Sequence, residues 1–378
     1  MVAMEHDGPL RITHVAESLQ QHGVARLVVD LALSQCRAGH RVQVISLRPG
    51  AEGAHALRRG RVGWVATDAA GLRRCLLDEP ADVVHTHDPT PHLHTVRALS
   101  GLGPQALVLT HHGVFGDEGD PRDAWTAPAL PWARCIVAVS AHAAARLRGL
   151  PGVDAARLAI VPNGIDLQQF AAVDRRAARQ RLGLTDDTKV IGSVGRLSHA
   201  KDHALLIRAF AEVRRRHGSA RLVIVGDGEL RPQLLRQAVL LGLGGDVLLT
   251  GARQDVAQVL PAFDVFALAS RAEGYPLALL EAAATGLPLV STDAGGCGEI
   301  VRDGVTGRLV PVGDGTALAD ALDDVLCDDP ARRALGAAAR AWAAEHACRE
   351  RMQQAYMTIY RRVLQYPEPS PAGVQMQG

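Results

Sequence analysis

An α/β architecture of two doubly wound domains is the fold class that this sequence predicts. The chain has 378 residues, more than one ordinary hydrophobic core needs. Short β-rich runs alternate with helical patterns along almost the whole chain, which is typical of parallel sheets with right-handed crossovers. The alternation stops once, after Phe170, and then starts again. Two such series predict two domains that face each other across a cleft, with ligands beyond the carboxyl ends of the strands.

The first series contains five expected strands, and the first of them is followed by a helical pattern that ends at Gly39. These strands are expected at 10–15, 41–47, 82–87, 106–111 and 135–140. The next stretch, AAVDRRAARQRLGLTDDT, is polar and basic and has no strand pattern. We therefore expect a helix and a linker on the surface there.

The second series follows this linker and contains six expected strands. They are expected at 189–195, 221–228, 246–251, 264–270, 287–293 and 307–313. From Arg332 to Tyr366 the pattern is helical without a strand, and the final PEPSPAGVQMQG is typical of a disordered tail.

Composition excludes several classes of protein. The 41 basic and 40 acidic residues nearly cancel, so charge gives no case for binding nucleic acid. The six cysteines form no CxxC pair, which leaves no visible zinc or redox motif and favours buried cysteines in a reducing compartment. No signal-peptide core and no membrane-length apolar run is found. We expect a globular protein of the cytoplasm.

Two carboxylates mark the stretch RAEGYPLALLEAAATG, in which Glu273 precedes a predicted helix and Glu281 lies within it. Pro276 suits the first helical turn, and Gly286 suits the C-cap. The free N–H groups at such a helix start attract anions. The arrangement suits a polyhydroxy ligand that bears phosphate. The alternative is a capping glutamate followed by a solvated glutamate on a helix face.

Two cations, Arg196 and Lys201, lie in the loop after the first strand of the second series. Together they could clamp a diphosphate, although Lys201 and Asp202 could equally form an ordinary surface pair. The later GDG at 226–228 lacks the third glycine of a dinucleotide fingerprint. We interpret it as a tight strand-to-helix turn near the ligand.

Several motifs in this order and spacing resemble family 4 of the retaining glycosyltransferases: VPNGIDLQQF, VGRLSHAKD, IVGDGEL, EGYPLALLEA and DAGGCGEIVRDGVTGRLV. The resemblance covers nearly the whole chain and is strongest from 160 to 313. It implies the GT-B fold, in which two Rossmann-like domains face each other across a cleft and the second binds most of the donor. The implied parts are an acceptor-side domain at 1–168, a nucleotide-sugar domain at 169–345, a helix at 346–366 that packs back toward the first domain, and a tail at 367–378.

The resemblance also implies roles for single residues. Glu281 matches the glutamate that binds the ribose hydroxyls, and Glu273 matches the one near the donor sugar. Arg196 and Lys201 match the pair that neutralises the diphosphate. Further donor-binding positions are Gly23, Gly195, Gly251, Gly274, Tyr275, Pro276 and Leu277.

Histidines supply the signals in the first domain. In the family, a histidine in a T-x-H-G context lies by the anomeric region of the donor sugar, and His112 of THHG matches it. His111 would then point to the opposite side of a continuing strand. The alternative for His112 is a loop histidine that the backbone satisfies. The run HTHDPTPHLH at 85–94 has the density of a metal site, but its histidines span a strand end and a helix start. The family needs no metal and no DxD occurs, so we expect neither a metal nor a cofactor.

Two departures from the family pattern concern glycine-rich segments. Where relatives show GGxER, the chain reads HGVAR at 22–26, so only Gly23 and Arg26 match, and Ala25 stands where relatives carry a carboxylate. Acceptor contacts at this segment therefore stay open. In GGCGE, Gly298 stands where relatives favour proline.

The function that the resemblance implies is a metal-independent retaining hexosyltransferase. It would move a sugar from a nucleotide-diphosphate sugar to a glycan or lipid-linked glycan, as in cell-surface or exopolysaccharide biosynthesis. Attack on the front face, with the leaving phosphate helping to deprotonate the acceptor, needs no enzyme nucleophile. Association with the inner face of the membrane is a further expectation. The alternatives are a degenerate nucleotide-sugar-binding subunit and a nicotinamide-dependent oxidoreductase.

Overall fold

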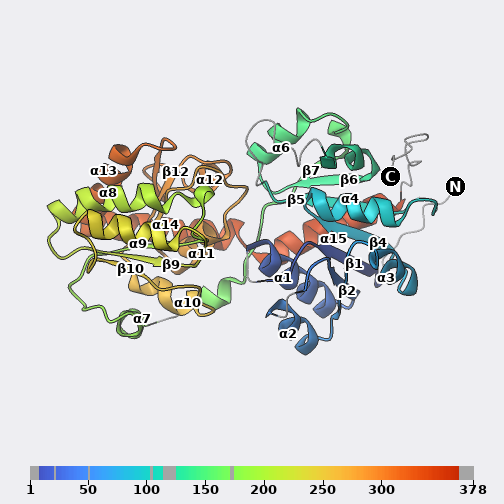
Figure 1. Cartoon of the computed structure of the whole chain (residues 1–378), viewed down its shortest axis with the longest axis horizontal. Helices are drawn as coiled ribbons and strands as arrows, with labels where there is room; N and C mark the ends of the chain where they lie inside the picture. The colour runs from blue at the N-terminus through green and yellow to red at the C-terminus, as the bar shows by residue number, and fades with distance from the viewer. Residues whose placement is uncertain are drawn as a thin grey trace. The chain divides into compact units, whose positions relative to one another are not determined.

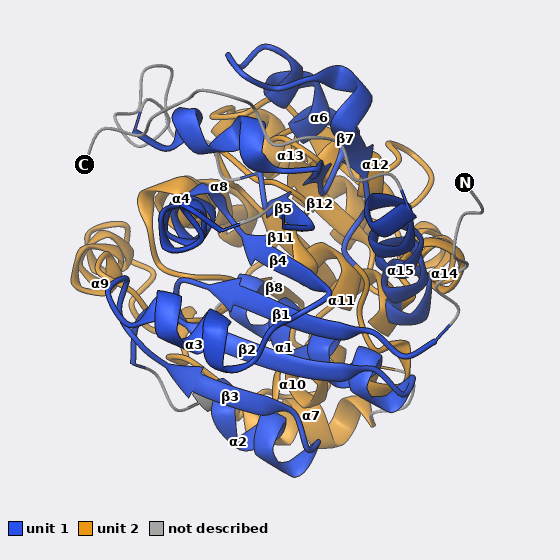
Figure 2. Cartoon of the chain, turned by 90° about the vertical axis from the view of Figure 1, so that its right-hand side faces the viewer, with its two compact units in different colours: residues 1–163, 349–378 blue, residues 164–348 orange. Residues whose placement is uncertain are grey.

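The computed structural model describes residues 8–20, 23–49, 52–102, 105–113, 125–170 and 174–365. The chain forms two compact units. Unit 1 consists of Met1–Asn163 and Arg349–Gly378, and unit 2 consists of Gly164–Cys348. The divisions thus lie a few residues from those that the sequence suggests. The C-terminal helix has the colour of unit 1 in Figure 2, and the tail expected at 367–378 lies outside the described residues.

Unit 1 contains a seven-stranded parallel sheet in the order β3-β2-β1-β4-β5-β6-β7. Figure 1 labels every strand of this sheet except β3. The strands are β1 (Arg11–Ala16), β2 (Arg41–Ser46), β3 (Gly63–Ala66), β4 (Val83–His87), β5 (Leu107–His111), β6 (Cys135–Ala138) and β7 (Leu158–Ile160). The order along the sheet reverses between β1 and β4. In doubly wound sheets this reversal opens a crevice at the carboxyl ends of the two strands.

The helices of unit 1 include the last helix of the chain. They are α1 (Gly23–Arg37), α2 (Glu52–Arg59), α3 (Leu72–Asp78), α4 (Pro89–Ala98), α6 (Ala141–Arg148) and α15 (Arg349–Gln365). In α15, Tyr356 and Tyr360 lie one helical turn apart and are fully buried. Their hydroxyls reach β5 and β4, so this helix completes the core of unit 1.

Unit 2 contains a six-stranded parallel sheet in the order β10-β9-β8-β11-β12-β13. Its strands are β8 (Val190–Val194), β9 (Arg221–Val225), β10 (Val247–Leu249), β11 (Val265–Leu268), β12 (Leu289–Thr292) and β13 (Gly307–Val310). Its helices are α7 (Arg175–Arg181), α8 (His203–Arg216), α9 (Arg231–Leu240), α10 (Val256–Val259), α11 (Leu277–Thr285), α12 (Cys297–Ile300), α13 (Gly315–Cys327) and α14 (Asp329–His346). Here the order reverses between β8 and β11. Apolar side chains of α8 and α13, such as Phe210 and Leu322, share one core with the sheet.

Every strand expected from the sequence is present, with shifted or shorter ends. The expectation for the linker helix, α7, is wrong in one respect, because this helix is not wholly on the surface. Arg179 is only 1% exposed, and its guanidinium donates to the Asp264 carboxylate at 2.9 Å and to three backbone carbonyls. A buried guanidinium needs such a full set of acceptors. Within the described part of the chain, no helix combines the length and the apolarity that crossing a membrane requires.

Candidate active site

The site in unit 2 is built on the loops that follow β8 and β11, the two strands at the reversal of its sheet. Lys201 ends a short 3₁₀ turn after β8, and Glu273 lies in the loop after β11. Their side chains meet, with 2.5 Å between Lys201 Nζ and Glu273 Oε1, and the Ser270 hydroxyl donates to the same oxygen at 2.6 Å. Glu273 is buried, so its charge needs these partners. The structure thus joins two predicted site residues and adds Ser270, which carries no motif signal.

Asp202 ties the same two loops together. Its carboxylate accepts from Arg271 Nε at 2.7 Å and also caps α8 by accepting from the backbone N–H of Leu205 at 3.0 Å. The Arg271 N–H donates to the Ala200 carbonyl at 2.8 Å. Asp202 has a φ of 39°, a left-handed conformation that a non-glycine residue adopts only when its surroundings hold it there. Lys201 therefore precedes a firmly held residue.

The GDG segment lets the loops after β8 and β9 pack closely. A Cβ on Gly226 would lie 1.9 Å from the Gly195 carbonyl oxygen, and one on Gly228 would lie 2.5 Å from the Leu197 carbonyl oxygen. The Gly226 N–H donates to the Gly251 carbonyl at 2.9 Å. These glycines therefore serve the tight turn that the sequence predicts, and they place Gly195 and Gly251 side by side with it.

Helix α11 begins next to this ion pair. Pro276 occupies its N-cap and no side chain caps it, so its first N–H groups retain their capacity to bind an anion. Gly274 and Tyr275, which precede it, are buried, and Leu277 is half-buried. Glu281 lies in the helix and is 4% exposed. The alternative of a capping glutamate and a solvated glutamate is therefore wrong, since Glu273 does not cap α11 and Glu281 is buried.

Behind Glu273, the loop after β12 approaches its backbone. Gly295 has a φ of 58°, and a Cβ there would lie 1.8 Å from the Glu273 carbonyl oxygen. Cys297 is fully buried nearby, and burial, aided by the Glu273 charge, raises the pKa of its thiol to about 12. A thiol in this state is a weak nucleophile. Gly295 therefore lets its loop lie close to the backbone of Glu273, and no side-chain motif in the sequence predicts this contact.

Arg196 takes a different position from Lys201. Its side chain is exposed, and among the contacts of the described residues none joins it to Lys201 or Glu273. Lys201 is held by a carboxylate, whereas Arg196 stands at the surface of the same loop.

The candidate residues of unit 1 lie at the carboxyl ends of β4 and β5. His112 follows β5, and its Nε2 lies 3.2 Å from Nδ1 of His87 at the end of β4. Its backbone N–H donates to Asp88 Oδ1 at 2.9 Å, and Asp88 has a φ of 72°. Burial lowers the pKa of His112, against an opposing effect of the Asp88 charge. His111 serves its own loop, since its Nδ1 accepts from the backbone N–H of Gly113 at 3.0 Å.

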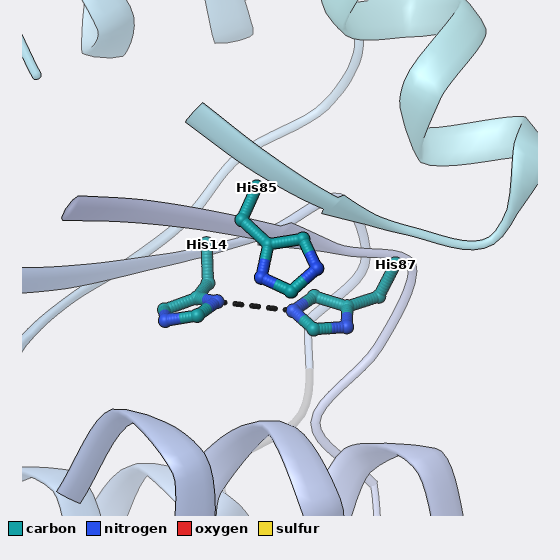
Figure 3. Close-up of side chains that lie close together, drawn as sticks. All are labelled: His14, His85 and His87. Carbon is teal, nitrogen blue, oxygen red and sulfur yellow. Dashed lines mark hydrogen bonds between the residues drawn. The ribbon is translucent and has the colours of Figure 1, made fainter. Parts of the chain in front are cut away.

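His112 is connected to a buried group of histidines from neighbouring strands. Figure 3 shows His14 of β1 with His85 and His87 of β4. The His14 and His87 rings are joined at 3.0 Å, between Nδ1 and Nε2. Burial lowers the pKa of His14 to about 4 and holds the pKa values of His85 and His87 well below their usual range. These rings are therefore neutral near pH 7.

The metal-like density noted at 85–94 is thus resolved into two groups. His85 and His87 join His14, whereas His92 binds the Thr86 hydroxyl at 2.9 Å and the Ala129 carbonyl at 3.0 Å. One nitrogen from each ring of the first group lies within 4.8 Å of the others, which is close enough for a metal ion. Hydrogen bonds within unit 1 already engage both nitrogens of all three rings.

A second group that could hold a metal consists of His217, Asp323 and Cys327. It lies at the end of α8 and on α13, away from the loops described above. Cys327 is exposed, and Cys36, Cys75 and Cys348 are half-buried, so the expectation of buried cysteines is right only for Cys135 and Cys297. His217 Nε2 and Asp323 Oδ1 are 2.6 Å apart, and Arg216 also binds Asp323, so the group is a surface ion-pair network.

The HGVAR segment is described only from Gly23, because His22 lies outside the described residues. Gly23 is the first residue of α1 and is exposed. Ala25 is buried in the first turn of the helix. The position at which relatives carry a carboxylate therefore faces the protein interior here.

In the comparison with known protein families, a separate family model matches most of each unit. A family model described as "Glycosyltransferase Family 4" matches residues 22–169, and one described as "Glycosyl transferases group 1" matches residues 174–342. A curated D-inositol 3-phosphate glycosyltransferase of Nocardia farcinica is 33% identical over 296 residues, which is 75% of this chain and 60% of that one. Its counterpart in Mycobacterium tuberculosis is 31% identical over 316 residues, or 81% of this chain and 60% of that one. The chain thus spans about 60% of the length of these relatives.

Solved structures with a similar fold include complexes with nucleotides. Anabaena HepE in complex with UDP and glucose has a TM-score of 0.85 and 22% identity, covering 93% of this chain and 99% of that one. A sucrose-phosphate synthase from Thermosynechococcus elongatus has a TM-score of 0.79 and 20% identity, covering 93% and 98%. At these identities the likeness shows the fold, which is the two-domain GT-B fold.

Proposed function

Because the chain belongs to family 4 of the glycosyltransferases, we propose that it transfers a sugar from a nucleotide-diphosphate sugar to a glycan or lipid-linked acceptor with retention of configuration. The observation that carries the proposal is the pair of Lys201 and Glu273 beside the uncapped start of α11. It places a cation, a carboxylate and free N–H groups together at the strand reversal where doubly wound sheets bind nucleotides.

Most of the donor roles are assigned within unit 2, and Gly23 and His112 of unit 1 are the exceptions. The Lys201 ammonium has three N–H donors, so its bond to Glu273 leaves others for a diphosphate, and the exposed Arg196 adds a guanidinium. Glu281 binds the ribose hydroxyls, and Glu273 faces the donor sugar. The loop glycines supply backbone N–H groups, as do Tyr275 and Leu277, whereas Pro276 has none to donate. HepE complexes with UDP and UDP-glucose support a uridine nucleotide as the first donor to test.

The proposed chemistry needs no metal, cofactor or enzyme nucleophile. The bond from the anomeric carbon to the phosphate oxygen breaks while the acceptor hydroxyl attacks from the same face, and its proton passes to the leaving phosphate. Charge that develops on the diphosphate is stabilised by the two cations and the helix start. His112 acts at the donor sugar. The enzyme would work in the cytoplasm, at the inner face of the membrane, in the synthesis of a surface polysaccharide.

The inositol phosphate acceptor in the names of the curated relatives gives a second candidate acceptor. The acceptor test therefore includes a free glycan, a lipid-linked glycan and inositol 3-phosphate. A hydroxyl group is the nucleophile in each case, so the donor chemistry is the same.

The proposal is tested by a panel of nucleotide sugars, first by thermal stabilisation and then by transfer. A ligand at one hundred times its Kd raises stability by about 2.7 kcal/mol. We expect stabilisation by at least one nucleotide sugar, transfer that chelator does not reduce, and a product that keeps the anomeric configuration in its NMR spectrum. Stabilisation by NAD alone would favour the oxidoreductase, and donor binding without any transfer or hydrolysis would favour a binding subunit.

His112 is tested by separating transfer from nucleotide affinity. In His112→Ala we expect slower single-turnover transfer with unchanged affinity for the free nucleotide, because the residues assigned to the nucleotide lie in unit 2. The neighbouring His111→Ala is the control and should slow transfer less, since His111 binds its own loop. Equal losses of transfer and affinity would contradict the role of His112 at the sugar.

A further inference from the structure

A continuous series of hydrogen bonds connects His112 to a glutamine on α1. Gln35 Oε1 lies 2.7 Å from His14 Nε2, His14 Nδ1 lies 3.0 Å from His87 Nε2, and His87 Nδ1 lies 3.2 Å from His112 Nε2. Figure 3 shows the central bond between His14 and His87. All four side chains are buried. The series crosses the sheet at the reversal between β1 and β4 and ends at the predicted catalytic histidine.

The direction of these bonds follows from elementary valence. A neutral imidazole carries one N–H donor and one acceptor nitrogen. Because the Gln35 oxygen only accepts, His14 carries its proton on Nε2 and must accept at Nδ1. His87 then donates from Nε2 and accepts at Nδ1. His112 consequently donates from Nε2, and its Nδ1 retains a lone pair.

A second set of bonds involves the amide nitrogen of Gln35. Its Nε2 faces the Tyr360 hydroxyl at 3.4 Å, and that hydroxyl lies 2.6 Å from His85 Nδ1. Tyr360 accepts from the amide and donates to His85, which donates from its own Nε2 to the Thr110 hydroxyl at 2.7 Å. These directions agree with the placement of the Gln35 oxygen toward His14 and of its amide nitrogen toward Tyr360 on α15.

We propose that Gln35, through His14 and His87, holds the proton of His112 on Nε2 and thereby presents the Nδ1 lone pair to a hydroxyl of the donor sugar. This inference rests on the proposed role of His112 at the sugar. Among the described residues, His112 Nδ1 has no hydrogen-bond partner. His14 and His87 are positioning residues, because they act through His112.

The same chemistry determines what the series does not do. A carboxamide does not take up a proton under ordinary conditions, so a proton cannot leave the series at Gln35. His112 is therefore a fixed hydrogen-bond acceptor and not one end of a proton relay. Such an acceptor discriminates against a sugar that lacks the matching hydroxyl, because its lone pair is then left unpaired.

Nuclear magnetic resonance of the whole protein, labelled with ¹⁵N in histidine, tests the series without any donor. We expect scalar couplings across the hydrogen bonds between His112 Nε2 and His87 Nδ1 and between His87 Nε2 and His14 Nδ1. Single substitutions assign the signals. A proton on His112 Nδ1 would overturn the proposal, as would a zinc-dependent shift of all three of His14, His85 and His87 at one equivalent of zinc.

Two substitutions of His87 test how the direction of the hydrogen bonds affects sugar transfer. In His87→Gln, the amide oxygen can accept from His112 while its nitrogen donates to His14, so the direction survives. In His87→Leu the direction is lost, because a leucine side chain neither donates nor accepts a hydrogen bond. We expect kcat to fall at least tenfold in the leucine variant and less than threefold in the glutamine variant, with nucleotide affinity unchanged in both.

The outcomes separate this inference from the proposed function. An absence of transfer in the unsubstituted protein would refute the function, whereas the coupling pattern would still decide the direction of the series. Equal loss of kcat in two folded variants, His87→Gln and His87→Leu, would overturn the positioning role. A panel of deoxy donors adds a test of specificity. The unsubstituted protein should transfer one deoxy sugar more slowly than the parent sugar, and His112→Ala should transfer the two at similar rates. No such convergence for any deoxy sugar would contradict an acceptor at Nδ1.

Discussion

Lys201 and Glu273 form an ion pair of 2.5 Å in unit 2, although 72 positions separate them in the chain. The Lys201 side chain is 23% exposed and that of Glu273 only 6%. Substitution of Lys201 alone therefore leaves a buried carboxylate without its cation. The pair links the stability of unit 2 to the residues proposed to bind the donor.

A double-mutant cycle measures this link. We expect Lys201→Met to destabilise unit 2 by about 1–3 kcal/mol, and Lys201→Met combined with Glu273→Gln to cost less than the sum of the two single changes. Chemical denaturation provides the free energies of unfolding. Lys189→Met is the control, because its pair with the half-exposed Asp329 should contribute less than about 1 kcal/mol. Additive losses at Lys201 and Glu273 would show that the pair has no coupling energy.

Glu281 gives a prediction on nucleotide affinity. Hydrogen bonds to a charged acceptor contribute about 1.5–3 kcal/mol each, so Glu281→Ala should weaken nucleotide binding roughly tenfold or more. Calorimetry on a variant with a native circular dichroism spectrum is the measurement. Glu212→Ala, at a half-exposed position on α8 of the same unit, is the control and should leave affinity unchanged. A folded Glu281→Ala variant with full affinity would refute the ribose assignment.

Gly295 gives a prediction on the shape of the site. Gly295→Ala places a methyl group against the Glu273 carbonyl and should displace that loop, so we expect loss of stability and weaker donor binding. Gly313→Ala is the matched control, since Gly313 also has a positive φ of 81° but has no atom within 4 Å of an added Cβ. It should cost about 1 kcal/mol for its conformation alone and leave donor binding intact. Equal effects of the two substitutions would show that contact with Glu273 is unimportant.

Buried histidines predict that acid destabilises unit 1. Burial lowers the pKa of His14 and of His92 to about 4, while an unfolded histidine titrates near 6.5. Between these values the unfolded chain binds protons that the folded chain excludes, so stability falls as the pH falls from about 6.5 to about 4. Each such histidine contributes about 1.4 kcal/mol per pH unit within that window and nothing above it.

His92→Gln tests this dependence, because glutamine does not titrate. The free energy of unfolding of the variant should depend less steeply on pH between 4 and 6.5 than that of the unsubstituted protein. His55→Gln, at an exposed histidine of α2, is the matched histidine-to-glutamine substitution with which the slope is compared. Parallel curves for His92→Gln and the unsubstituted protein would mean that His92 is protonated in the folded state.

The sequence predicted the strands whose apolar residues are buried, and it missed the two at the edges of the first sheet. β3 reads GWVA and β7 reads LAI, and both are short and at most half-buried. An edge strand packs on fewer neighbours, so its residues carry a weaker apolar pattern. The surface assignment of α7 failed for a related reason. Its arginines look solvated in the sequence, but the burial of Arg179 depends on Asp264, which lies far along the chain.

Where a motif lies within one loop and its helix, as with Glu273, Pro276 and Glu281, the sequence predicted where its residues lie relative to the helix start, and their roles in donor binding stay predictions. Contacts that depend on strand order could not be predicted. His14 meets His85 because β1 pairs with β4, and no pattern within either strand reveals that neighbour. Gln35 and Tyr360 join the same group from two different helices. The polar partners of these histidines can be identified only once the fold has brought together three segments that are distant in the sequence.

The C-terminal helix also determines the order in which the protein can be completed during synthesis. Unit 2 is one uninterrupted segment, whereas unit 1 needs residues from both ends of the chain. When synthesis has reached Cys348, all residues of unit 2 are present. At that point β4 and β5 still lack the tyrosines that bind His85 and Thr110. The domain whose synthesis begins first is therefore the last to reach its native core. A chain cut short before α15 would carry an intact unit 2 attached to an unfinished partner.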